Sequence, residues 1–457
     1  MLTHDTPIEN DSRLSSRAPQ HIARLWCAAM GITRGRSWSH RRFLLTLAAF
    51  ALIARVIVAI GLETYLERIG LGGFTGADDA AYDRVSWTMA QHWHGIGPIV
   101  GVEEQYLVNV YTYVSGAVYY AFGHLPFAIK TLNCALGVVT VALVYCIAFQ
   151  IFGTVAARFS SLFAAFFPTT FLWSTLNLKD TLFACFVLAL FAFVTRLVIT
   201  GDRRMIVPAL VTMLLLGGVR LYAEVMLCIL LPIVLFLQPN RTFRHKWSTA
   251  AIVLAGCLLL FYVSGASAWL GLSPGKELPQ ESYINPTRLN QQRQYAGQDG
   301  STSFVQEPIP GSPQGSSGVA DSGHSKIEAV LGLASWLPKG LAYVLAAPFP
   351  WMFRRPIDFA LLPEILLWYS AMILAAIGAI ANWRNWAKYL PLLGYLGGMA
   401  IILAVVSGNL GTLVRSRGML IPGMLIFAGA GFAWLLARRT GDVSTKVSLL
   451  DSSTSQG

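Results

Sequence analysis

The stretch "FLLTLAAFALIARVIVAIGL", from Phe43 to Leu62, decides the fold class because it is long and apolar enough to cross a lipid bilayer. A transmembrane helix needs about 20 consecutive apolar residues, and Arg55 is the only charged residue in this run. The basic sequence "RGRSWSHRR" precedes it. Because cytoplasmic flanks carry an excess of Lys and Arg, we predict that the chain before Phe43 lies in the cytoplasm.

The composition of the whole chain extends this interpretation. Of 457 residues, 55% are hydrophobic and 12% are charged, whereas a soluble domain has roughly 25% charged residues. The net charge of +11 does not indicate a nucleic-acid partner, because the Lys and Arg residues fall mostly in short links between apolar runs. A transmembrane barrel would show short alternating segments instead. We therefore predict an all-α polytopic membrane protein.

Hydropathy along the chain predicts about ten transmembrane helices, with both ends in the cytoplasm. Two further helices are expected at the membrane interface, in the first outer loop, over 78–93 and 106–122. The predicted spans are 43–62, 127–149, 155–173, 181–199, 205–221, 223–237, 249–270, 360–381, 390–406 and 419–436.

The same pattern divides the chain into five parts. The six cysteines have no CxxC spacing, so no disulfide framework or structural zinc site is expected. The predicted parts are a disordered basic cytoplasmic tail (1–42), a transmembrane module (43–270) that includes the first outer loop (63–126), a flexible low-complexity outer loop (271–338), C-terminal interfacial and transmembrane helices (339–437) and a cytoplasmic tail (438–457).

Acidic residues on the predicted outer side are candidates for catalysis, because charges near the hydrocarbon are costly. Asp78 and Asp79 begin the helical sequence "DDAAYDRVSWTMAQ". One of them could cap the helix, but two adjacent carboxylates exceed what a cap needs. We expect at least one to act as a general base toward a hydroxyl. Asp180, in "LNLKDTLF", is a second candidate acid, because its turn is predicted to lie on the same side.

Basic residues on the same predicted side are candidates for binding phosphate, which arginine grips through two donors. The alternative is that each reaches toward lipid headgroups. These arginines form three groups on one predicted face of the membrane, which favours phosphate binding over contact with lipid headgroups. The residues are Arg220, Arg354, Arg355, Arg415 and Arg417.

The order of these motifs resembles that of the GT-C superfamily of membrane glycosyltransferases, which includes protein O-mannosyltransferases and lipid A aminoarabinose transferases. The resemblance is carried by the acid pair at Asp78 and Asp79, by a helix ending in "FG" at Phe122, by a later acid at Asp180 and by the arginine-rich "VRSRGMLIPGM" near the C-terminus. It implies a GT-C-like helical fold and transfer of a sugar from a polyprenyl-phosphate carrier to a hydroxyl acceptor. The transfer would be a single inverting displacement on the outer face of the cell membrane.

The resemblance also implies roles for individual residues. Asp78 and Asp79 would be catalytic, Tyr82 and Lys179 would bind substrate, and a divalent cation such as Mg²⁺ or Mn²⁺ could be held by the pair together with Asp180. Two alternatives remain open. An O-antigen-type polymerase or ligase would not need the acid pair. A transporter or flippase would place charges midway through its spans, whereas the charges here cluster at one membrane face, with Arg55 as the main exception.

Overall fold

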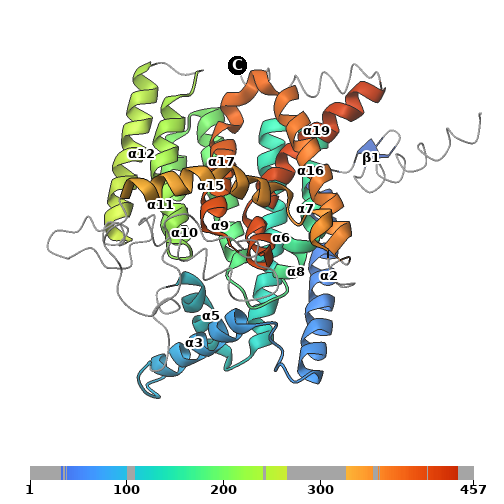
Figure 1. Cartoon of the computed structure of the whole chain (residues 1–457), viewed down its shortest axis with the longest axis vertical. Helices are drawn as coiled ribbons and strands as arrows, with labels where there is room; N and C mark the ends of the chain where they lie inside the picture. The colour runs from blue at the N-terminus through green and yellow to red at the C-terminus, as the bar shows by residue number, and fades with distance from the viewer. Residues whose placement is uncertain are drawn as a thin grey trace, which may run out of the picture.

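The computed structural model shows a bundle of α-helices (Figure 1). It describes residues 32–33, 36–37, 39–99, 109–239, 243–264, 326–353, 359, 361–408 and 410–440. Within these ranges the only strands are β1 (Ile32–Thr33) and β2 (Arg36–Ser37), which form a short antiparallel pair. The prediction of an all-α polytopic membrane protein is confirmed. The predicted tails before Ile32 and after Thr440, and most of the predicted loop 271–338, lie outside the described residues.

Seven helices are long and apolar enough to cross a membrane in the part of the chain that the structure describes. Each coincides with a span predicted from hydropathy, so the chain is a multi-pass membrane protein. These helices are α2 (His40–Arg68), α6 (Pro126–Phe152), α9 (Asp180–Thr200), α12 (Phe243–Val263), α16 (Leu362–Ala381), α17 (Trp386–Val406) and α19 (Ile421–Thr440).

Three further predicted spans correspond to shorter helices, so the total of ten spans stays a prediction. Helix α7 (Thr154–Phe166) has 13 residues, α10 (Ile206–Gly217) has 12 and α11 (Leu221–Phe236) has 16. The third predicted span is broken into α7 and α8 (Pro168–Trp173). Phe167 has extended backbone angles there, because a residue that precedes proline is sterically kept out of the helical region.

The segment predicted to be the first outer loop carries two helices, as expected from the sequence. Helices α3 (Ala77–Trp93) and α5 (Val110–Phe122) pack together at one end of the bundle, at the bottom of Figure 1. Gly116 of α5 lies close against α3, because a Cβ at this position would lie 3.3 Å from the Ser86 carbonyl oxygen and 3.4 Å from the Trp93 ring. The N-terminus of α9 lies near the start of α3, because Asp180 and Asp78 accept hydrogen bonds from the same arginine, Arg415.

Helix α15 (Lys326–Ala346) runs across the bundle, at a steep angle to α12 and α17 (Figure 1). It begins inside the segment predicted to be a loop as far as Pro338, so that boundary is corrected. The proline lies within the helix, and Trp336 Nε1 donates a hydrogen bond of 2.9 Å to the Ala404 carbonyl of α17. Packing against α17 thus extends the helix beyond the limit that local composition indicates.

The core of the bundle depends on close contact between helices at small residues. A Cβ on Gly431 of α19 would lie 2.0 Å from the Leu374 carbonyl oxygen of α16, and a Cβ on Gly378 would lie 2.1 Å from the Phe427 carbonyl oxygen. Small residues let helix backbones approach in this way within membranes. The remaining helices are short: α18 (Leu410–Ser416) and the 3₁₀ turns η1 (Arg203–Met205), η2 (Pro350–Met352), η4 (Trp383–Asn385) and η5 (Arg417–Met419).

Candidate active site

Two of the predicted acids meet at one arginine. Arg415 of α18 donates from Nη1 to Asp78 Oδ2 at 2.5 Å, and from Nε and Nη2 to Asp180 Oδ2 at 3.0 and 2.8 Å. Each carboxylate lies in the first turn of a helix, α3 or α9, where the helix dipole favours negative charge. Three segments that are far apart in the sequence therefore form one charged cluster.

Arg220 completes the ion pairs on Asp180. It is the N-cap residue of α11, and it donates from Nη2 to Asp180 Oδ1 at 2.5 Å and from Nη1 to the Tyr222 hydroxyl at 3.0 Å. Burial opposes the charge of Arg220, but the nearby Tyr222 and Asp180 outweigh it and raise the pKa of the guanidinium. Asp180 is thus held between two permanently charged arginines.

Lys179 places a third cation at this cluster. Its ammonium group lies 5.6 Å from the centre of the Tyr82 ring, and it forms no ion pair with a carboxylate in the described residues. Burial, and then the nearby charge of Arg220, lower the pKa of Lys179 to about 8. The two predicted substrate-binding residues therefore lie beside each other at the site.

The acid pair divides into two different roles. The Asp79 side chain is 1% exposed and accepts hydrogen bonds from Thr75 N and Oγ1 (2.7 and 2.9 Å), from Gly76 N (2.9 Å) and from Ala80 N (3.1 Å). It therefore caps α3. Asp78 has 47% of its side chain exposed, and its Oδ1 accepts no hydrogen bond in the described residues. Of the pair, Asp78 is the exposed residue and Asp79 the buried one.

The arginines that were predicted to bind phosphate do not all lie at the cluster. Arg417 is 4% exposed, and it donates to the carbonyl oxygens of Val344 and Tyr343 at 2.7 and 2.8 Å, and to that of Ala347. These carbonyls end α15, so Arg417 caps that helix. Arg220 and Arg415 lie in the cluster, whereas Arg354 and Arg355 are outside the described residues.

A buried polar network, which was not predicted as part of the site, positions the turn that carries Lys179 and Asp180. Asn133 of α6 donates to the carbonyls of Leu176 and Leu178 at 2.6 and 3.1 Å. It also donates to the Tyr111 hydroxyl, which in turn donates to Asn177 Oδ1 at 2.6 Å. The sequence signal was the presence of Asn133 inside an apolar span, because buried polar groups are costly without partners.

The carboxylates of the cluster are largely occupied by arginine. Both oxygens of Asp180 and Oδ2 of Asp78 accept hydrogen bonds from Arg220 or Arg415. No group of three or more His, Cys, Asp or Glu residues that could hold a metal ion occurs in the described part of the chain. A divalent cation shared by both acids would compete with Arg415 for their oxygens, whereas Asp78 Oδ1 accepts no hydrogen bond in the described residues.

The comparisons with known proteins support the resemblance. The dolichyl-phosphate-mannose-protein mannosyltransferase family matches residues 109–269, about a third of the chain, which include Asp180 and Arg220. No curated protein matches the chain in sequence.

Solved structures match over a longer range. The oligosaccharyltransferase AglB of Archaeoglobus fulgidus, in complex with an inhibitory peptide and a dolichol-phosphate, is 14% identical, with a TM-score of 0.52 over 88% of this chain and 51% of that one. Its apo form has a TM-score of 0.51 at 12% identity, over 88% of this chain and 52% of that one. ArnT of Cupriavidus metallidurans bound to undecaprenyl phosphate is 16% identical, with a TM-score of 0.49 over 88% of this chain and 62% of that one.

The chain spans about half the length of the archaeal enzyme that it matches. At these identities the likeness concerns the fold. The fold and the family match together confirm the resemblance to the GT-C superfamily of membrane glycosyltransferases.

Proposed function

We propose that the protein transfers a sugar from a polyprenyl-phosphate carrier to a hydroxyl acceptor, at the outer face of the cell membrane. The observation that carries this proposal is the cluster of Asp78, Asp180, Arg220 and Arg415, gathered from four elements at one end of a membrane bundle. The family match over residues 109–269 and the dolichol-phosphate in the archaeal structure of the same fold support a lipid-phosphate donor.

The donor phosphate would bind at the basic side of the cluster. The pKa values of Arg220 and Arg415 are both raised, so both side chains remain charged. Each already neutralises a carboxylate, so Lys179 is the group whose charge is available to a monoanionic phosphate diester. Charge-assisted hydrogen bonds from these groups would hold the phosphate and stabilise the charge that develops on it as the sugar leaves.

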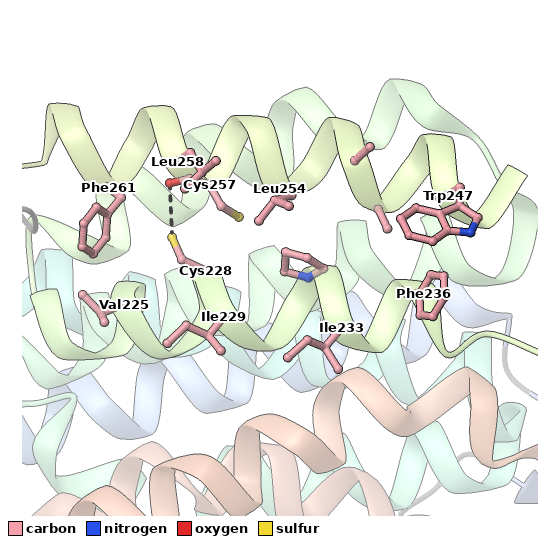
Figure 2. A pocket seen from close by; sticks show the side chains of 13 residues that line it. Val225, Cys228, Ile229, Ile233, Phe236, Trp247, Leu254, Cys257, Leu258 and Phe261 are labelled. Atoms are coloured by element: carbon pink, nitrogen blue, oxygen red, sulfur yellow. Dashed lines mark hydrogen bonds between the residues drawn. The ribbon is translucent and has the colours of Figure 1, made fainter. Parts of the chain in front are cut away.

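An apolar groove near the cluster would hold the isoprenoid tail of the donor. It lies between α11 and α12, has a volume of about 640 Å³, and is lined by apolar side chains that face one another across the gap (Figure 2). Ile229 and Leu258 are more than half exposed there, as suits a surface that faces lipid. The groove begins at Val225, little more than one helical turn beyond Arg220, so one ligand could reach both.

Asp78 would activate the acceptor. Its Oδ1 is available and its Oδ2 is held by Arg415 at 2.5 Å, so the carboxylate is oriented while one oxygen remains open. It would remove the proton from an acceptor hydroxyl, which attacks the anomeric carbon opposite the phosphate. A single displacement of this kind inverts the anomeric configuration. The transferred sugar would be a hexose or a pentose.

The acid pair itself offers a matched test. We expect Asp78→Asn to lower kcat for sugar transfer about 100-fold or more, the usual scale for a missing general base. Asp79→Asn, one residue away, should retain most of the activity and instead lower the melting temperature, because it weakens the cap of α3. The measurement uses purified protein in nanodiscs, a radiolabelled polyprenyl-phosphate sugar and chromatography of the acceptor.

The outcomes separate the parts of the proposal. Equal loss of kcat in both variants, at unchanged stability, would contradict the assignment of the base to Asp78. Absence of transfer by the wild-type protein from every polyprenyl-phosphate sugar would contradict the proposed donor.

The requirement for Mg²⁺ or Mn²⁺ stays a prediction. The test is to measure sugar transfer after chelation and again after re-addition of each ion.

A further inference from the structure

Arg55 is a buried cation that the proposed chemistry has not yet used. It lies within the membrane-spanning helix α2 and is 1% exposed. Its Nε donates to the Ser174 hydroxyl at 2.9 Å and its Nη1 to the Ala51 carbonyl at 3.2 Å. Among the described residues it has no carboxylate partner. An unneutralised charge in a membrane span is costly and therefore points to a function.

The surroundings of Arg55 are built to hold it. The guanidinium lies over the Phe171 ring, 4.9 Å from its centre. Gly137 of α6 leaves room for the side chain, because a Cβ there would lie 3.0 Å from Arg55 Nε and 2.9 Å from Ser174 Cβ. The position of the charge is thus set by three elements, α2, α6 and α8 with the turn that follows it.

A small cavity connects this charge to the site. Arg55 lines a cavity of about 30 Å³ whose wall also includes Asp180 and Arg415, which is room for about two water molecules. Arg55 and two members of the cluster thus share this cavity. Charges act over longer distances in such low-dielectric surroundings than in water.

The proposed reaction concentrates negative charge on the phosphate. In the donor, the phosphate is a diester with one negative charge. The bond between the anomeric carbon and the phosphate oxygen breaks, its electron pair stays on that oxygen, and the acceptor proton passes to Asp78. The lipid phosphate that leaves is a monoester with two negative charges. The negative charge thus moves from Asp78 to the phosphate, and Arg415 exchanges one carboxylate partner for it while Asp180 keeps its two arginines. Arg55 would add to the positive charge that faces the phosphate at this point.

We propose that Arg55 stabilises the second negative charge of the departing lipid phosphate from the membrane side of the site. Arg55 would act electrostatically across the cavity and would not touch the phosphate. It is therefore not a catalytic residue. This inference rests on the proposed function. It predicts that the protein binds a phosphate monoester dianion more tightly than a diester monoanion, and that Arg55 contributes to this preference.

The test uses two ligands that differ in one charge. Farnesyl phosphate and its methyl ester are compared at pH 8, where the first is a dianion and the second a monoanion, by calorimetry on the full chain in nanodiscs. For Arg55→Gln we expect the ratio of the two Kd values to fall about tenfold, the scale of one lost charge interaction. Arg55→Lys should keep most of the preference, and Arg196→Gln, which alters an exposed arginine at the far end of α9, should leave it unchanged.

The results distinguish the inference from the proposed function. If Arg55→Gln weakens the binding of both ligands by the same factor, or does not weaken the binding of either, Arg55 has only a structural role and the inference is wrong. If the wild-type protein binds neither ligand, the lipid-phosphate donor is wrong and the inference fails with it. Should Arg55→Gln not fold, Gly137→Ala displaces the guanidinium without removing it, and the preference for the monoester should then fall in that variant. An unchanged preference in Gly137→Ala would overturn the inference.

Discussion

At the scale of single residues, neighbours in the sequence have different roles because a helix turns each side chain by about 100° from the last. Asp79 faces back to the start of α3 and caps it, whereas Asp78 faces Arg415. The same separation occurs on the C-terminal side of the site, where Arg415 joins the acids and Arg417 caps α15. Pairs of charges that look redundant in the sequence are therefore not interchangeable.

Lys179 gives a pH prediction at this scale. Its pKa is lowered to about 8, so the ammonium is mostly charged at pH 7 and loses its charge as the pH rises through 8. Binding a phosphate monoanion favours the charged form, so donor affinity should be highest below pH 8 and fall above it. We expect the apparent donor KM to rise severalfold between pH 7 and pH 9.

The measurement is a donor KM profile over that range, with two variants of the lysine. Lys179→Arg keeps its charge and should remove the alkaline rise in KM. Lys179→Met should show a raised KM that no longer changes with pH. An alkaline rise that persists unaltered in Lys179→Met would assign the titration to another group.

At the scale of elements, side chains from the C-terminal helices determine how α15 ends. Trp368 Nε1 donates to the Leu345 carbonyl at 2.6 Å and the Tyr369 hydroxyl donates to the Ala346 carbonyl at 2.5 Å. Arg417 donates to three more carbonyls at this end. The last carbonyls of a helix have no partner within it, so these donors fix the position of α15.

Arg417→Ala is therefore predicted to affect stability more than substrate binding. Loss of hydrogen bonds from a charged donor should cost roughly 1.5–3 kcal/mol, seen as a lower melting temperature in detergent. The donor KM should change less than it does in Arg415→Ala, which removes a cluster residue. If Arg417→Ala raised the donor KM as much as Arg415→Ala does, at an unchanged melting temperature, the result would indicate that Arg417 binds the donor phosphate.

At the scale of the whole molecule, the bundle orients the cluster toward one side of the membrane. The positive-inside rule predicts that this side is the outer one. Leu71, after α2, and Asn385, between α16 and α17, are exposed near opposite ends of the bundle. A cysteine at Leu71 should react with an impermeant thiol reagent in intact cells, and one at Asn385 only after permeabilisation.

The background for this labelling replaces Cys27 and Cys146 with alanine. The other four cysteines are buried and should react slowly. Labelling of both introduced cysteines in intact cells, or of Asn385→Cys alone, would contradict an outward-facing active site.

The sequence by itself determined the class of the protein and most of its helices. Hydropathy located the seven long spans, because an apolar run of sufficient length has few alternatives to a membrane helix. It also identified Asp78, Asp180, Arg220 and Arg415, because charged residues beside apolar segments are unusual. The prediction of the loop as far as Pro338 was wrong, because packing against α17 and not local composition extends α15.

Only the tertiary structure decided which of these residues act together. Asp78 and Arg415 are separated by most of the chain, and no local pattern indicates that Arg415 Nη1 lies 2.5 Å from Asp78 Oδ2. The same holds for the contact of Arg55 with Ser174. Sequence periodicity reports which face of a helix is buried, but the partner of a buried charge depends on how several helices pack. For that reason the roles of Asp79 and Arg417 became clear only when their partners on the folded backbone were known.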